Sequence, residues 1–184
     1  PYLTPWRVGI AIGMVFLVTL INLRGVKESG KAFAVPTYFF IAMMFLTVGL
    51  AFFRHLTGAL GQVVNPPPLE MAHEVQAMSL FLLLHAFSSG TTALTGVEAI
   101  SNGTTAFRQP RSRNAGATLI WMSVILGTLF LSITFISGQI GAVPSEQETV
   151  ISQLARTVFQ GQGLLYLATI AATTVILIMA ANTS

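Results

Sequence analysis

The chain has 184 residues, of which 53% are hydrophobic and 8% charged, and its mean hydropathy is +0.75. A soluble domain carries about 25% charged residues, so most of this surface is unsuited to water. The net charge is +3, but the basic residues are concentrated in two short loops and form no stripe along a helix, which argues against nucleic acid as a partner. Without cysteine, the chain has no disulfide framework, thiolate metal site or cysteine nucleophile.

The two ends of the sequence also carry information. It starts Pro-Tyr-Leu-Thr and stops directly after an apolar run, so we expect it to be part of a longer chain. The start has no charged segment followed by a short apolar core and a small-residue cleavage site, so we expect no signal peptide.

Long apolar stretches dominate the chain and predict transmembrane helices. A helix needs about 20 apolar residues to cross the hydrocarbon core of a bilayer. Four uninterrupted stretches come close to this length or reach it: 6–23, 36–53, 115–136 and 161–181, the last apolar from Leu164 onward. A fifth stretch, 77–107, is long enough but is interrupted by Ser, Thr, Gly and one glutamate, so it predicts a discontinuous helix. The sequence therefore predicts an all-α polytopic membrane protein with five transmembrane helices.

The charges of the loops predict the orientation. With five crossings, the basic loops 24–31 and 108–113 fall on one side of the membrane, which the positive-inside rule makes cytoplasmic. Loops 54–76 and 137–163, which hold glutamates, fall on the opposite side. We therefore expect a multi-pass protein of the plasma membrane, with the lipid bilayer as its main surroundings.

The second outer loop contains an amphipathic helix, predicted over 145–159. Ser145 and Glu148 form the Ser-x-x-Glu pattern of a capping box, in which Ser145 accepts from an amide of the first turn and Glu148 reaches back. Apolar residues recur on one face after it: Val150, Ile151, Leu154, Ala155, Val158 and Phe159. This helix is too short to span, so it either lies on the membrane surface or folds inward as a lid over a substrate path.

Two histidines, His55 and His73, lie in or next to the first outer loop and are candidate metal ligands. His55 and His73 have no second ligand at a spacing typical of metal sites. We expect no metal site in this chain.

The interrupted stretch 77–107 carries the chemistry. Unpaired backbone groups cost several kcal/mol in hydrocarbon, so an unwound helix must be buried in protein or lined by water. Unwinding at Leu94 to Gly96 would leave free carbonyls that can bind a cation, with the hydroxyl of Thr95 beside them. They would face the N-terminus of a second half-helix at Val97 and Glu98. Glu98 is the one acidic residue that the sequence places inside the membrane, and such a carboxylate can exchange a proton for a metal ion.

A second interpretation of the same residues is structural. Glycines and small hydroxyl residues also let membrane helices approach closely, and Ser and Thr can bond to their own helix. Glu98 favours the functional interpretation, because an intramembrane ionisable group usually serves a function. His85 could be a second proton carrier, although a histidine at the interface is the simpler interpretation.

The residues around this glutamate resemble a known family. Three segments resemble the sixth transmembrane helix and the following loop of amino acid-polyamine-organocation (APC) superfamily transporters: 86–103, 106–110 and 113–119. Within the superfamily, the KimA-type potassium importers share further segments, namely 22–29, 148–153 and 180–183. The resemblance covers nearly the whole chain and its motifs are long.

The resemblance implies a LeuT-type inverted-repeat core in which the five crossings are the fourth to eighth helices. It implies potassium import with protons, with Thr95 and Glu98 lining the ion path. Two departures are Thr91, where relatives often have cysteine, and His85, where they often have Lys or Arg. The resemblance also implies a possible homodimer through a cytosolic domain absent from this chain.

Together these observations predict a secondary transporter with proton-coupled potassium uptake. The expected ion-binding residues are Thr91, Leu94, Thr95, Gly96 and Glu98, with Glu98 as the proton-exchanging group. No resident cofactor is expected beyond the transported cation, such as K⁺, and the coupling proton.

Two alternatives stay open. In an amino-acid permease of the same superfamily, the half-helix N-terminus would hold a substrate carboxylate, although Glu98 would repel it. A structural membrane subunit would explain the small residues but not the buried glutamate. An enzyme is not expected, because the chain has no His-x-x-x-His pair and no second acid to pair with Glu98.

Overall fold

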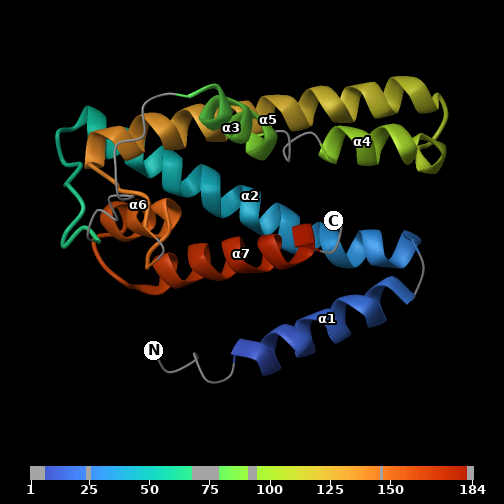
Figure 1. Cartoon of the computed structure of the whole chain (residues 1–184), viewed down its shortest axis with the longest axis horizontal. Coiled ribbons are helices and arrows are strands. Elements are labelled where there is room, and N and C mark those ends of the chain that lie inside the picture. Colours follow the sequence, from blue (N-terminus) through green and yellow to red (C-terminus); the bar gives the residue numbers. More distant parts are fainter. Residues whose placement is uncertain (1–6, 24–25, 68–78, 91–94, 146, 182–184) are drawn as a thin grey trace. The chain divides into compact units, whose positions relative to one another are not determined.

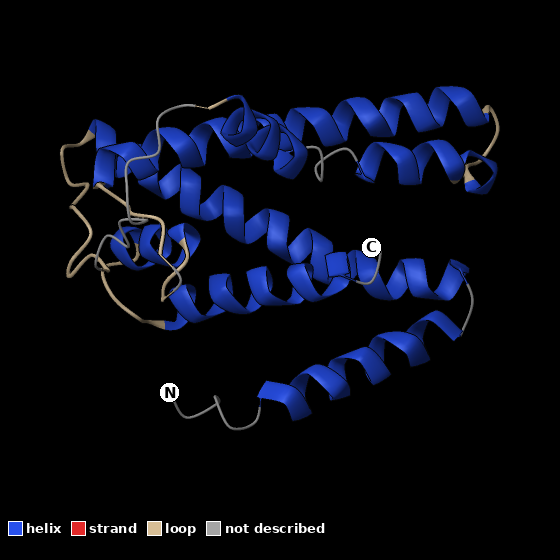
Figure 2. Ribbon diagram, in the orientation of Figure 1, coloured by secondary structure: helices blue, strands red, loops and turns tan. Residues whose placement is uncertain are grey.

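A computed structural model describes residues 7–23, 26–67, 79–90, 95–145 and 147–181. Within these ranges the chain forms helices and loops and contains no strand, as Figure 2 shows. The expectation of an all-helical protein is therefore confirmed for the part of the chain that is described.

The helices differ strongly in length. At 1.5 Å per residue, the 31 residues of α2 and the 30 of α5 each extend about 45 Å, which exceeds the roughly 30 Å hydrocarbon core. By length and composition, Phe33–Leu56 and Arg111–Ile140 can cross a membrane, and Val8–Leu20 and Leu164–Ala180 are shorter apolar helices. The elements are α1 (Arg7–Leu23), α2 (Val26–Leu56), α3 (Leu80–Gly90), α4 (Thr95–Asn102), η3 (Thr104–Ala106), α5 (Arg111–Ile140), α6 (Val150–Val158) and α7 (Leu164–Ala181).

The chain divides into two compact units. The first contains residues 1–67 and 133–184, hence α1, α2, α6, α7 and the last turns of α5. The second contains residues 68–132, hence α3, α4, η3 and the first turns of α5.

In the first unit, α2 packs chiefly against α7, and the two helices run side by side in Figure 1. Thr47 on α2 and Thr169 on α7 are completely buried. Their hydroxyls donate to the carbonyls of Met43 and Leu165 four residues earlier, at 2.8 and 2.9 Å. A threonine whose hydroxyl is satisfied by its own helix is small enough for close helix packing, which explains these polar residues in the core.

The apolar core of the first unit surrounds α6. Leu154 and Val158 of α6 are fully buried against the C-terminal turns of α5 and a neighbouring part of α2. Phe52 stacks on Phe135 with ring centroids 5.8 Å apart, and His55 meets the same ring edge-on at 5.5 Å. His55 thus packs on an aromatic ring, and His73 lies outside the described residues.

Much of the apolar surface of the described helices is exposed. On α5 alone, Trp121, Phe130 and Leu131 expose more than two thirds of their surface. Exposed apolar surface on this scale is typical of helices that meet lipid or further protein. This supports a membrane location for the chain.

Two expected helix boundaries were wrong. Helix α2 begins at Val26, ten residues before the expected start at 36, and Pro36 lies inside it. A proline is tolerated inside membrane helices when nearby groups compensate, and the hydroxyl of Thr37 donates to the Phe33 carbonyl at 2.8 Å. Helix α5 begins at Arg111, so 26–31 and 111–113 are helical and not loops.

The expected capping box at Ser145 was also wrong. Helix α6 starts at Val150, and its N-cap is Thr149, whose hydroxyl accepts from the Ser152 amide at 3.2 Å. Ser145 accepts only from the Gln147 amide two residues later, at 3.1 Å. The Glu148 carboxylate reaches forward along α6 and not back, because Ser152 and Arg156 offer it two donors.

The apolar face of α6 packs against the protein and not on a membrane surface. Leu154, Ala155 and Val158 have no exposed surface, because α2 and the end of α5 cover them. Of the two placements expected for this helix, the structure favours the one folded against the protein.

Candidate functional site

The predicted ion site lies in the second unit, where two short helices replace one long one. Helix α3 ends at Gly90 and α4 begins at Thr95. Two of the predicted ligands, Thr91 and Leu94, lie outside the described residues.

Two of the predicted site residues lie in a helix. Thr95 and Gly96 were expected in an unwound segment, but they form the first turn of α4. A Cβ added at Gly96 would lie 3.0 Å from the terminal methyl of Met122 on α5. The absence of a side chain at Gly96 therefore leaves room for the end of the Met122 side chain beside α4.

Glu98 lies in the first turn of α4, and its side chain is exposed among the described residues. A carboxylate in the first turn is favoured by the partial positive charge of a helix N-terminus. Glu98 therefore places a negative charge at the start of α4. His85 on α3 is exposed and stacks on Phe81, with ring centroids 6.2 Å apart.

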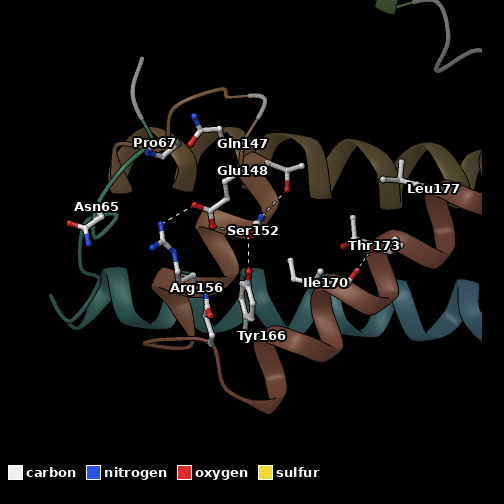
Figure 3. A pocket seen from close by; sticks show the side chains of 13 residues that line it. Asn65, Pro67, Gln147, Glu148, Ser152, Arg156, Tyr166, Ile170, Thr173 and Leu177 are labelled. Carbon is white, nitrogen blue, oxygen red and sulfur yellow. Dashed lines mark hydrogen bonds and ion pairs between the residues drawn. The ribbon is translucent and has the colours of Figure 1, made fainter. Parts of the chain in front are cut away.

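A polar cavity of about 560 Å³ lies in the first unit. Figure 3 shows its lining, which comes from the loop after α2, from α6 and the residues before it, and from one face of α7. The lining residues are Asn65, Pro67, Gln147, Glu148, Thr149, Ser152, Arg156, Gln162, Tyr166, Ile170, Thr173, Thr174 and Leu177.

Four side chains form a network in this cavity (Figure 3). Arg156 donates from Nη2 to Oε2 of Glu148 at 3.0 Å, and the two side chains are 21% and 22% exposed. The hydroxyl of Ser152 donates to Oε1 of Glu148 at 2.8 Å and lies 3.0 Å from the hydroxyl of Tyr166 on α7. The carboxylate thus links the residues before α6 to α6 itself and, through Ser152, to α7.

Gln153 fixes the residues that precede α6 from the other side. Its side chain is completely buried, with Oε1 accepting from the Val143 amide at 3.0 Å. Its Nε2 donates to the carbonyls of Val143, at 2.7 Å, and Glu148, at 3.2 Å. These bonds satisfy backbone groups that have no partner within a helix, so Gln153 holds 143–148 in place.

The sequence analysis did not single out Arg156, Gln153 or Tyr166. One pattern in the sequence pointed to Arg156. It lies four residues after Ser152 and eight after Glu148, a spacing that brings residues to the same side when the chain is helical. No sequence pattern pointed to Tyr166, because it reaches Ser152 from a different helix.

Comparisons with known proteins identify the family. A family model described as amino acid permease matches residues 1–184. The chain belongs to this family. It is also 41% identical, over 183 residues, to a protein named potassium transporter KimA from Bacillus subtilis (strain 168). The match covers the whole of this chain and 30% of that protein's length.

Family membership confirms the resemblance to APC superfamily permeases of the KimA kind. It places the chain among the amino acid permeases. A surface made largely of exposed apolar helices agrees with that assignment.

Proposed function

We propose that this chain forms part of the core of a proton-coupled potassium importer in the plasma membrane. The observation that carries the proposal is that Glu98, the one Asp, Glu, Lys or Arg of 77–107, lies in the first turn of the short helix α4. The 41% identity to a protein named as a potassium transporter supports potassium as the cargo.

In the proposed site, the carbonyl group of Leu94 and the hydroxyl of Thr95 coordinate the cation. Free carbonyls at a helix end carry partial negative charge and suit a cation that gives up its water. Glu98 binds a proton or faces the cation, because an ionised carboxylate without a counter-charge is costly inside a membrane. The movements of the cation and of the proton are thereby coupled at the Glu98 side chain.

The proposed architecture is a LeuT-type inverted repeat with five crossings in this chain, the third of them interrupted. Helices α1, α2, α5 and α7 form four of the crossings, and α3 with α4 forms the fifth. The basic residues at 24–31 and 108–113 then face the cytoplasm. A homodimer would form through parts of the protein outside these residues.

The family model's description, amino acid permease, favours a second candidate function. In that case the N-terminus of α4 would bind the carboxylate of an amino acid. Glu98 in the same turn opposes a substrate carboxylate, so potassium is the better-supported cargo.

Rubidium uptake by the complete protein in proteoliposomes tests the proposal. Uptake should be driven by an inward proton gradient, blocked by unlabelled potassium and unaffected by amino acids. Glu98→Gln should abolish the response to the gradient, whereas Asn102→Ala, a polar change on the same short helix, should retain it. Proton-driven rubidium uptake that persists in Glu98→Gln would refute the role assigned to the glutamate. Competition by an amino acid would favour the second candidate.

A further inference from the structure

Helix α7 has two different faces in the first unit. One face lines the polar cavity with Tyr166, Ile170, Thr173, Thr174 and Leu177, which recur at helical spacing. Another face lines an apolar groove of about 170 Å³ that is shared with α1 and α2, through Val175, Ile178 and Met179. Hydroxyl groups thus mark the cavity face of a helix that is otherwise strongly apolar.

The hydroxyls on the cavity face suit contact with water. Thr173 and Thr174 donate to the carbonyls of Thr169 and Ile170, each at 2.8 Å. Their donors are therefore satisfied within the helix, and their oxygen lone pairs can accept from water in the cavity. Together with Tyr166 they extend the polar lining along two turns of α7.

The part of the cavity lining that the structure describes holds one ion pair. Of its 13 residues, Glu148 and Arg156 carry a formal charge, and they pair at 3.0 Å. Both side chains keep about a fifth of their surface exposed, so ions in the cavity experience their field. The intact pair leaves the lining without net charge, and loss of either partner leaves one full charge of known sign.

We propose that this cavity is a water-filled vestibule and that the Glu148–Arg156 pair sets its charge selectivity. The side from which the vestibule opens and the identity of the transported ion rest on the proposed function, but the charge selectivity does not. Arg156→Gln leaves a negative vestibule that concentrates cations, and Glu148→Gln leaves a positive one that excludes them.

The test uses single cysteines in the complete protein, because these 184 residues contain none. Cysteines elsewhere in the protein are first replaced. Thr173→Cys lies on the cavity face, and Val175→Cys lies two residues away, on the groove face, as a control at nearly equal depth. Each is treated from the outside with membrane-impermeant methanethiosulfonates that carry either a trimethylammonium or a sulfonate group.

We expect Thr173→Cys to react and Val175→Cys not to react. The ratio of cationic to anionic reaction rates at Thr173→Cys should rise at least threefold with Arg156→Gln and fall at least threefold with Glu148→Gln. The exchanged pair, Glu148→Arg with Arg156→Glu, should return the ratio to the starting value, because it restores neutrality.

Two outcomes would overturn the inference. If Thr173→Cys does not react while the ion pair is intact, a vestibule open to the outside is excluded. A ratio that shifts in the same direction in both Gln variants would exclude charge selectivity. Rubidium uptake is measured separately, so a failed potassium assay with retained thiol selectivity would reject the proposed cargo and support the vestibule.

Discussion

The polar side chains of the two units differ in bonding and exposure. In the first unit, Gln153 and Glu148 are bonded to defined partners, and Gln153 is completely buried. In the second unit, Glu98 lies exposed in the first turn of the short helix α4. The bonded polar residues of the first unit therefore hold the structure together, whereas Glu98 is proposed to contribute charge to a site.

The difference suggests two roles for a carboxylate in a membrane protein, one in packing and one in the proposed ion site. Glu148 is neutralised by Arg156 and by a hydroxyl, so its charge stabilises the packing of α6. Glu98 is free to respond to an ion or a proton that arrives from outside the described structure. Substitutions that affect stability in one unit and transport in the other test this division.

The largest loss of stability is expected for Gln153→Ala. It removes three hydrogen bonds and leaves the part-buried amide and carbonyl of Val143 without this partner. Each unsatisfied buried group costs about 1–3 kcal/mol, so we expect a total of about 3–5 kcal/mol. The unfolding temperature of the purified complete protein should fall markedly, while Gln147→Ala, at an exposed neighbour, should leave it unchanged. Equal unfolding temperatures for the two variants would contradict the structural role of Gln153.

A smaller effect is expected when the two glutamates receive the same substitution. Glu148→Gln removes the ion pair and leaves a guanidinium that is four-fifths buried, with a buried Nε that already has no partner among the described residues. We expect a loss of about 2 kcal/mol. Glu98→Gln should leave the unfolding temperature unchanged, because that side chain is exposed. If Glu98→Gln destabilises the protein as much as Glu148→Gln, the proposed division between the units is wrong.

The sequence alone predicted the helical class and the family. Apolar runs and the motif around Glu98 carry these signals within single segments, so they can be read without tertiary structure. The sequence failed where a choice depended on contacts between segments. Gly96 looked like a point of unwinding, but it lies in a helix, opposite Met122. Nothing in the local pattern distinguishes these two reasons for a glycine.

The same limit explains the errors at helix ends. The predicted transmembrane stretch begins at 36, yet α2 begins at Val26 and continues through Pro36. Ser152 and Tyr166 lie 14 residues apart on different helices, and only the fold brings them together. Thr91 and Leu94, which lie outside the described residues, stay predictions.

A moderate effect is expected from adding bulk where α4 approaches α5. Gly96→Val would push its methyl groups against Met122, whereas a side chain at Gly127 on α5 has nothing within 4 Å at its Cβ position. We expect Gly96→Val to cost about 1–2 kcal/mol and Gly127→Val less than half of that. Gly96→Ala should be nearly neutral, because the flexible end of Met122 can move and alanine favours the helix. Comparable losses for the two valine variants would indicate that helix propensity and not close packing accounts for Gly96.

The smallest effect concerns the two possible caps of α6. Thr149→Ala removes the side-chain bond to the Ser152 amide and should cost about 1 kcal/mol. Ser145→Ala removes an exposed bond to the Gln147 amide, outside the helix, and should cost little. The capping box read from the sequence predicts the reverse order, so unfolding temperatures of the two variants decide between them. Because Ser152 also bonds to Glu148 and Tyr166, loss of the Thr149 cap should further weaken the contact between α6 and α7. Thr149→Ala and Glu148→Gln should therefore be non-additive in a double-mutant cycle, whereas Ser145→Ala and Glu148→Gln should add.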